Sequence, residues 1–163
     1  MNEFTFLSNS LADTDRLAAA VVFVLPERAT IALCGTLGAG KTRFVQGLAA
    51  AIGIDRAEVT SPTFVLCQQY RGTRQLYHLD AYRLRDADEF RELGTDEFFA
   101  EPALTLIEWA DKVELALPES YLLMQIEVTG ELTRRVRISA VGDQLAEMPA
   151  QIAARLGKNA GNL

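Results

Sequence analysis

The residue types best suited to chemistry form one glycine-rich run, Gly35-Thr36-Leu37-Gly38-Ala39-Gly40-Lys41-Thr42. Its pattern is G-x-x-x-x-G-K-[S/T], in which the glycines let backbone N–H groups turn inward around phosphate oxygens. Lys41 would place an ammonium between the outer phosphates, and Thr42 would offer its hydroxyl to Mg²⁺. The run therefore predicts a phosphate-binding loop (P-loop) for a nucleotide with Mg²⁺. Its predicted contact residues are Leu37, Gly38, Ala39, Gly40, Lys41 and Thr42.

Two acidic residues are candidates to complete this site, because a P-loop needs a second group to hold or orient hydrated Mg²⁺. Such a group usually ends a neighbouring strand. Glu108 ends the apolar run Leu104–Ile107, and Asp80 ends Leu76–Leu79. The first run is the more hydrophobic, as a central parallel strand should be, so we assign Glu108 to the metal side. Asp80 is then expected to position the attacking water or sense the γ-phosphate, with a hairpin-end cap as the alternative.

Three hydroxyl residues, Thr60, Ser61 and Thr63, surround Pro62 in an expected loop after the P-loop helix. In nucleotide switches this place carries a hydroxyl that meets Mg²⁺ or the γ-phosphate. A turn or capping role is equally compatible with any one of them. The only histidine, His78, is expected to be a hydrogen-bonded structural residue.

These candidates must be positioned by a strand before the loop and a helix after it. Thr30–Cys34 is an apolar run that enters the loop, and Thr42–Ile52 has helical periodicity, with Gly53 as its stop. Another helix is expected to begin after a cap at Ser10 or Asp13 and to end at Leu25, before Pro26. Two more are expected over Ala87–Leu93 and Gln144–Leu156. Other expected strands are Phe4–Leu7, Phe64–Tyr70, Gln75–Asp80, Thr105–Trp109, Leu122–Val128 and Arg134–Ala140.

Phe64–Tyr70 and Gln75–Asp80 are joined by a short turn around Gly72, and Leu122–Val128 and Arg134–Ala140 by one around Gly130. Each pair is close enough in sequence to be an antiparallel hairpin. The sequence thus predicts an α/β fold, a P-loop NTPase-like mixed sheet with a parallel core and antiparallel additions, flanked by helices. We expect one domain over residues 1–157 and a frayed tail over 158–163.

Composition limits the functions that this chain can perform. Its 49% hydrophobic and 23% charged residues are ordinary globular values. The formal net charge of −6 argues against a direct grip on a nucleic-acid backbone. The N-terminus resembles no signal peptide and no apolar run is long enough to cross a membrane, so we expect a cytoplasmic protein. Cys34 and Cys67 form no metal-ligand pattern and are expected to be small buried side chains.

Guanine recognition is not indicated. The chain has neither the D-x-x-G switch nor the N-K-x-D guanine reader of GTPases, so ATP is the expected nucleotide.

Four motifs in order resemble the bacterial TsaE (YjeE) family, strongly from Ala29 to Trp109 and weakly to Ala140. They are Gly35–Thr42, Ser61-Pro62-Thr63-Phe64, Tyr77-His78-Leu79-Asp80-Ala81-Tyr82-Arg83-Leu84 and Ile107-Glu108-Trp109. The resemblance implies an ATPase required for threonylcarbamoyladenosine formation in tRNA. It also implies that the chain acts with the TsaD and TsaB proteins, which leaves tRNA contact to those partners.

The resemblance also implies roles for individual residues. Lys41 would bind phosphate, Thr42 and Glu108 would serve Mg²⁺, and Asp80 would support hydrolysis. Trp109 would lie near the nucleotide. Lys41, Asp80 and Glu108 are thus the expected catalytic residues. Arg135 matches an arginine near the nucleotide, with Arg134 or Arg137 as alternative registers.

This chain departs from the family pattern at two positions. Thr36 stands where aspartate is usual, within the variable part of the loop, and should not abolish nucleotide binding. Ala81 stands where a bulky residue is common, which suggests an altered partner contact.

Two other functions share most of these residues. A small-molecule kinase would need an acceptor pocket, often under an arginine-rich lid, and no such lid is evident in the sequence. A nucleotide-dependent binding module with little hydrolysis would use the same binding residues.

Overall fold

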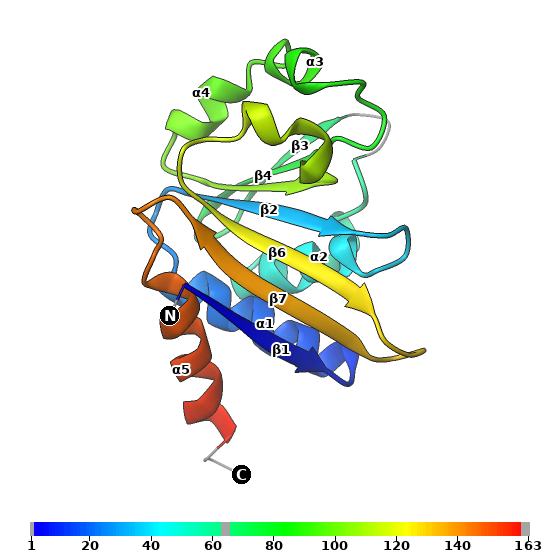
Figure 1. Cartoon of the computed structure of the whole chain (residues 1–163), viewed down its shortest axis with the longest axis vertical. Coiled ribbons are helices and arrows are strands. Elements are labelled where there is room, and N and C mark those ends of the chain that lie inside the picture. Colours follow the sequence, from blue (N-terminus) through cyan, green and yellow to red (C-terminus); the bar gives the residue numbers. More distant parts are fainter. Residues whose placement is uncertain (1, 63–65, 161–163) are drawn as a thin grey trace.

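Seven strands form one sheet in the order β1-β7-β6-β2-β5-β4-β3 in the computed structural model, which describes residues 2–62 and 66–160 (Figure 1). The strands are β1 (Glu3–Ser8), β2 (Ala29–Gly35), β3 (Cys67–Arg71), β4 (Gln75–Asp80), β5 (Leu104–Glu108), β6 (Tyr121–Val128) and β7 (Arg134–Val141). Strands β6, β2, β5 and β4 are parallel neighbours, whereas β3, β7 and β1 pair antiparallel at the two edges. The predicted mixed sheet is confirmed.

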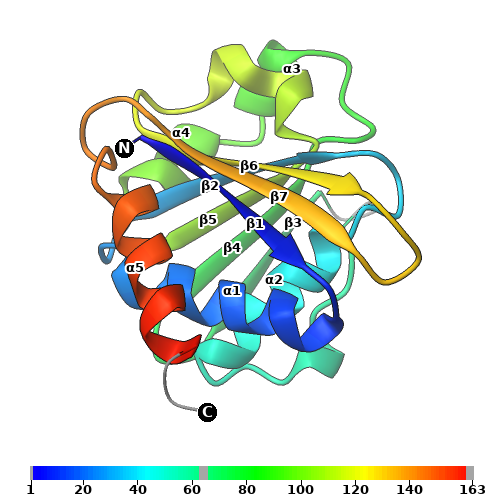
Figure 2. The same cartoon turned by 60° about the horizontal axis from the view of Figure 1, so that its bottom comes forward.

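Helices cover the two faces of the sheet (Figures 1 and 2). One layer contains α1 (Leu11–Val24), α2 (Lys41–Ala51) and α5 (Met148–Ala160). The other contains α3 (Ala87–Arg91), α4 (Thr95–Ala100) and the 3₁₀ segment η2 (Ala110–Ala116), while a short 3₁₀ turn, η1 (Arg56–Glu58), follows α2. Each layer encloses its own cluster of buried apolar side chains, so the sheet is held from both sides.

The central strands are apolar because both of their faces are buried. All five residues of β5 are buried, as are the first five residues of β2. Side chains alternate between faces along a strand, so Leu104, Leu106 and Glu108 point toward the layer that contains α2. The last residue of the strand thereby reaches the edge of the sheet where the P-loop lies.

The expected helix ends are largely found. The side chain of Ser10 accepts a hydrogen bond from the Asp13 backbone N–H and caps α1, which ends at Val24 before Pro26. Both predicted hairpins are present.

Two predicted elements differ from the structure, and one helix of the structure was not predicted. Strand β3 begins at Cys67, and residues 64 and 65 of the strand predicted from Phe64 lie outside the described residues. Helix α5 begins at Met148 rather than Gln144, because Pro149 lacks an N–H and fits only a first helical turn. It extends to Ala160, and the rest of the predicted tail is not described. The short helix α4 was not predicted, since Gly94 reads as a helix end and not as the start of another.

No helix within residues 2–62 and 66–160 has the length and apolar character needed to cross a membrane.

Candidate functional site

The P-loop connects the end of β2 to the start of α2. Gly38 and Gly40 have φ angles of 77° and 107°, which residues with a Cβ rarely adopt. The first hydrogen bond of α2 runs from the Phe44 N–H to the Gly40 carbonyl at 2.9 Å. The glycines therefore let the chain turn sharply from strand to helix, with the helix N-terminus at the loop.

Lys41 is buried at the base of the loop. Its Nζ donates to the Gly35 and Thr36 carbonyls at 2.6 and 2.9 Å and lies 4.0 Å from the centre of the Trp109 ring. Burial lowers the pKa of this ammonium, and the nearby carboxylates of Glu108 and Asp80 oppose that shift. The amine is thus held in place beside acidic groups, within the loop expected to receive phosphate.

Trp109 lies over Lys41 because of an unusual backbone conformation. Its φ of 58° is in the left-handed region, where a bulky residue is strained. The indole contacts Lys41 on one side and the Tyr82 ring, 5.0 Å between centroids, on another. Trp109 therefore lies beside the loop, while its position near a nucleotide stays a prediction.

Glu108 and Thr42 meet at the C-terminal end of β5. The Thr42 hydroxyl donates to Glu108 Oε1 at 2.8 Å, and His78 Nε2 lies 2.8 Å from the same oxygen. Both Glu108 and His78 are buried. The two residues assigned to Mg²⁺ from sequence thus lie in direct contact, next to Lys41.

Asp80 lies beside Glu108 because the two residues are register partners in β4 and β5. Its Oδ1 accepts from the Tyr82 backbone N–H at 2.8 Å, and its Oδ2 accepts from Ser61 Oγ at 3.1 Å. The first contact is the turn-capping role considered as the alternative. The second places the Ser61 hydroxyl beside the carboxylate, and both residues line the same cavity.

Of the two loop hydroxyls that the structure describes, Ser61 lines the cavity beside Asp80 and Thr60 does not. Thr63 lies outside the described residues.

These groups surround a cavity of about 350 Å³. Its lining residues are Leu37, Gly38, Ala39, Gly40, Lys41, Thr42, Arg43, Ser61, Asp80, Tyr82, Glu108 and Trp109. All of the predicted site residues except Arg135 therefore contribute to one cavity.

The donor set of this cavity suits Mg²⁺. Thr42 and Glu108 offer hard oxygen ligands, and no cluster of three or more His, Cys, Asp and Glu side chains in the described part of the chain could hold a metal alone. Mg²⁺ commonly keeps several waters and takes its other ligands from one or two protein groups and phosphates. The residues present fit that pattern.

The arginine that touches the loop is Arg134, not Arg135. Arg134 Nε donates to the Ala39 carbonyl at 2.8 Å, whereas Arg135 pairs with Glu127 at 2.8 Å on the opposite side of β7. Neighbouring strand residues point to opposite faces, so a shift of one position decides which arginine reaches the loop. Arg137 shares the face of Arg135 and is also away from the loop cavity.

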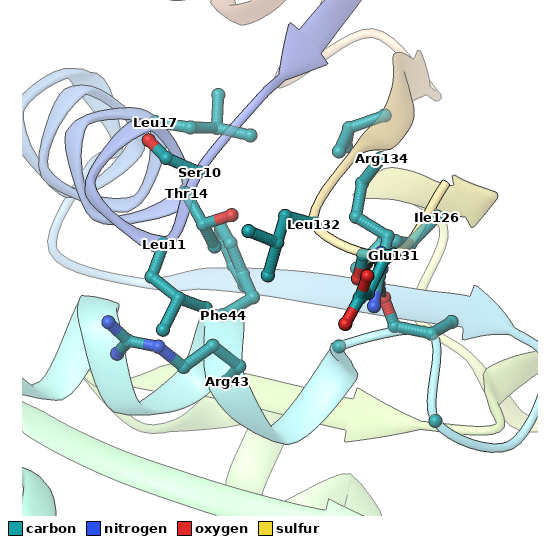
Figure 3. A pocket seen from close by; sticks show the side chains of 14 residues that line it. Ser10, Leu11, Thr14, Leu17, Arg43, Phe44, Ile126, Glu131, Leu132 and Arg134 are labelled. Carbon is teal, nitrogen blue, oxygen red and sulfur yellow. Dashed lines mark hydrogen bonds between the residues drawn. The ribbon is translucent and has the colours of Figure 1, made fainter. Parts of the chain in front are cut away.

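A second hollow adjoins the loop on the side away from Glu108. It has a volume of about 270 Å³ and shares Gly38, Ala39 and Gly40 with the first cavity. Figure 3 shows Leu11, Phe44, Leu132 and Arg134 around it. Much of its lining is apolar, from residues that are far apart in sequence: Leu11, Leu17, Phe44, Ile126, Leu132 and Val136.

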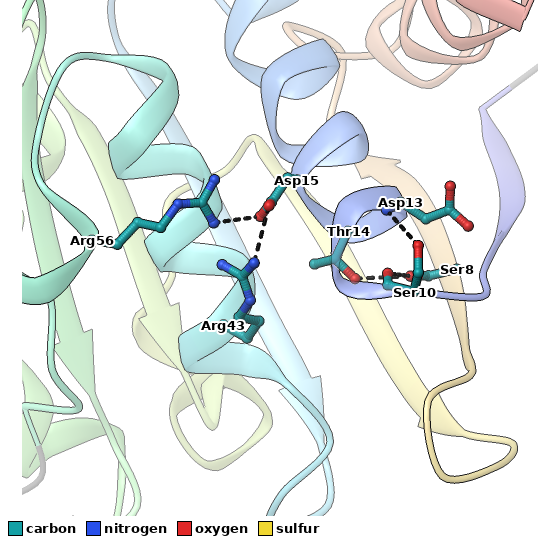
Figure 4. A network of polar contacts seen from close by, with 7 residues as sticks. All are labelled: Ser8, Ser10, Asp13, Thr14, Asp15, Arg43 and Arg56. Carbon is teal, nitrogen blue, oxygen red and sulfur yellow. Dashed lines mark hydrogen bonds and ion pairs between the residues drawn. The ribbon is translucent and has the colours of Figure 1, made fainter.

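An ion-pair network supports the helix that follows the loop (Figure 4). Asp15 of α1 pairs with Arg43 of α2 at 3.0 Å and with Arg56 of η1 at 2.7 Å. Three elements around the site are thus joined through one carboxylate.

The suggested effect of Ala81 on a partner contact stays a prediction, and the structure places this side chain in the core. Ala81 is fully buried and packs in the same apolar cluster as Leu84 and Phe90. A small residue at this position faces the core, because Ala81 points to the face opposite that of Asp80.

The cysteines are less buried than predicted. Both are half-buried and free, and burial raises the pKa of each thiol to about 11.

Comparison with known proteins identifies the family of this chain. Residues 8–136 match the family model described as "Threonylcarbamoyl adenosine biosynthesis protein TsaE". The chain belongs to the TsaE family. It is 38% identical over 133 residues to the tRNA threonylcarbamoyladenosine biosynthesis protein TsaE of Treponema pallidum, which covers 82% of this chain and 98% of that protein. Identity to the TsaE protein of Bacillus subtilis is 42% over 115 residues, covering 70% of this chain and 71% of that one.

The fold matches a solved structure along nearly the whole chain. The crystal structure of Bacillus subtilis YdiB superimposes with a TM-score of 0.76 at 28% sequence identity, covering 97% of this chain and 96% of YdiB. The resemblance inferred from the four motifs is confirmed by these comparisons, and it extends over most of the chain.

Sequence reasoning missed several residues of the site. Tyr82 lines the cavity and could have been predicted, because it lies two positions after Asp80 in the motif that runs from Tyr77 to Leu84. No local pattern marks Leu11 or Leu132, which reach the second hollow only through the packing of α1 and the β6–β7 hairpin.

Proposed function

We propose that this chain is a Mg²⁺-dependent ATPase required for threonylcarbamoyladenosine formation in tRNA, and that it acts in the cytoplasm on a complex of TsaD and TsaB. The observation that supports this most strongly is the contact of Thr42 with Glu108 beside Lys41, in a cavity formed by the P-loop. Membership of the TsaE family supports the tRNA-modification role.

The residues of the cavity divide into binding and hydrolytic roles. Lys41 and the loop N–H groups would hold the outer phosphates, and Thr42 and Glu108 would hold Mg²⁺. The metal would neutralise charge on the transferred phosphoryl group. Asp80, next to Glu108 and bonded to Ser61, would accept a hydrogen bond from the attacking water.

The second hollow is the proposed place for the base and ribose. The hollow shares Gly38, Ala39 and Gly40 with the phosphate cavity, and its apolar lining would bury a flat aromatic ring. Arg134, bonded to Ala39, stands between the hollow and the loop. Adenine is favoured over guanine by the absence of the N-K-x-D sequence.

Hydrolysis by the chain alone is expected to be slow. The net charge of −6 disfavours direct contact with tRNA, so the partners would hold the RNA. A partner seated at the cavity could complete the alignment of water and phosphate.

The test is ATP turnover by the purified chain with and without TsaD–TsaB, together with an assay of tRNA modification. We expect turnover to rise when the pair is added, and modification to depend on intact Lys41. Phosphorylation of a metabolite without any effect of the pair would replace this proposal with a kinase. Modification that needs ATP binding but proceeds without turnover would indicate a nucleotide-dependent binding module.

A further inference from the structure

His78 is a buried polar residue on a strand of the site, in a position where an apolar side chain would pack. It is fully buried in β4, between Gln68 of β3 and Leu106 of β5 as register partners. Its Nδ1 has no hydrogen-bond partner among the described residues. Burying a polar group without a partner costs free energy, so the ring is disfavoured here unless its other nitrogen compensates.

That other nitrogen contacts the site. Nε2 lies 2.8 Å from Glu108 Oε1, and an ionised carboxylate only accepts, so Nε2 carries the hydrogen. The same Oε1 accepts from the Thr42 hydroxyl at 2.8 Å. Both hydrogen bonds fall on one oxygen, so they restrain the rotation of the carboxylate and leave Oε2 free of both donors.

The pairing of β4 with β5 explains how His78 reaches Glu108. His78 and Asp80 are on the same face of β4, the face that carries Glu108 in β5. Asp80 is directly opposite Glu108, and His78 is one diagonal step back, a separation that a ring can bridge.

We infer that His78 is a positioning residue that holds Glu108 in the orientation needed for Mg²⁺. This inference rests on the proposed Mg²⁺–nucleotide function. A ligand carboxylate held by a second hydrogen-bonded group keeps its geometry, and loss of such a group commonly lowers metal affinity by about 10–100-fold.

The test compares three substitutions that differ in reach. His78→Gln keeps an N–H donor at about the distance of Nε2, His78→Asn keeps the polarity but is too short, and His78→Leu removes the donor. Tyr77→Phe is the matched control, because it removes the hydrogen bond of Tyr77 to Glu101 from the adjacent position on the opposite face.

Two quantities are measured by calorimetry for each folded variant: ATP affinity without Mg²⁺, and the Mg²⁺ concentration that gives half-maximal ATP binding. We expect His78→Leu and His78→Asn to raise that Mg²⁺ concentration by about tenfold or more, while affinity without Mg²⁺ changes by less than about twofold. His78→Gln and Tyr77→Phe should both stay within about threefold of the unmodified chain.

A purely structural His78 would give a different pattern. Equal Mg²⁺ requirements in the Asn, Gln and unmodified chains would overturn the inference, as would a parallel loss of affinity with and without Mg²⁺. If His78→Leu does not fold, the comparison of Gln with Asn decides alone. Absence of Mg²⁺-dependent ATP binding in the unmodified chain would overturn the proposed function as well, whereas normal Mg²⁺ dependence with unaffected variants would overturn only the role of His78.

Discussion

The two hollows on either side of the P-loop are built in different ways. The cavity that holds Lys41, Asp80 and Glu108 is formed by a continuous loop and by the ends of adjacent parallel strands. The apolar hollow is formed by α1, α2 and the β6–β7 hairpin, whose residues lie as far apart as Ser10 and Val136. The polar cavity therefore depends on sheet register and hydrogen bonds, while the apolar hollow depends on how distant elements pack.

This difference predicts how each hollow responds to substitution. Loss of one hydrogen-bonding group in the polar cavity leaves its partners buried and unpaired, which is costly. Loss of one side chain in the apolar hollow removes only a part of the contact area. Substitutions in the polar cavity should thus have large and specific effects on phosphate binding and hydrolysis. Substitutions in the apolar hollow should have small effects on binding of the base.

Asp80 and Glu108 should give the largest effects, and of different kinds. We expect Asp80→Ala to retain ATP binding while turnover falls by about 10²–10⁴-fold, the range for loss of a group that handles a proton. Glu108→Ala should abolish the dependence of binding on Mg²⁺. Turnover assays measure the effect of Asp80→Ala, and Mg²⁺ titrations of ATP binding measure that of Glu108→Ala. Glu108→Gln is the control, because it keeps the shape of the side chain and an oxygen that accepts from Thr42 and His78. The reverse pattern would mean that the two carboxylates exchange roles.

Lys41→Ala should weaken ATP binding by roughly a hundredfold, ~3 kcal/mol, because it removes a buried charge from the phosphates. Calorimetric titration measures the affinity, and circular dichroism should show an intact fold. Unchanged ATP affinity in the folded variant would contradict the assignment of the loop.

Leu132→Ala should weaken ATP binding by about threefold to tenfold, ~1 kcal/mol, through lost apolar contact in the second hollow. Binding of inorganic tripolyphosphate should not change, since it lacks the base. The control is Leu115→Ala, another exposed leucine, which lies in η2 and outside both hollows. An equal loss for tripolyphosphate would show that the hollow does not receive the base.

Asp15→Ala should have the smallest effect on the nucleotide and act on stability. It leaves Arg43 and Arg56 without their shared carboxylate, and the partial exposure of all three side chains limits the loss of unfolding free energy to about 1 kcal/mol. Urea unfolding measures the change. Asp88→Ala, which removes an exposed pair with Arg91, should be nearly neutral. Equal effects of the two would show that the network adds nothing.

The polar cavity was largely predictable from sequence because each of its residues is tied to a local pattern. The glycine spacing fixes the loop, and an acidic residue after an apolar run fixes the end of a buried strand. Glu108 and Asp80 therefore met as expected, since parallel strands end at the same edge of the sheet.

The remainder depends on information that a local pattern does not contain. The choice between Arg134 and Arg135 needs the register of β7 to within one residue. The hollow around Leu132 needs the relative position of α1 and the hairpin, which no periodicity specifies. The contact of His78 with Glu108 needs the pairing of β4 with β5, although both residues belong to recognised motifs.

The strained backbone of Trp109 has an optical consequence. The chain contains one tryptophan, and its ring lies 4.0 Å from Lys41 Nζ. Indole emission responds to nearby charge, so any anion that Lys41 receives alters the electric field across the ring. The whole tryptophan signal of this chain thus originates beside the P-loop, so the proposed arrival and departure of phosphate should be measurable in real time without a label.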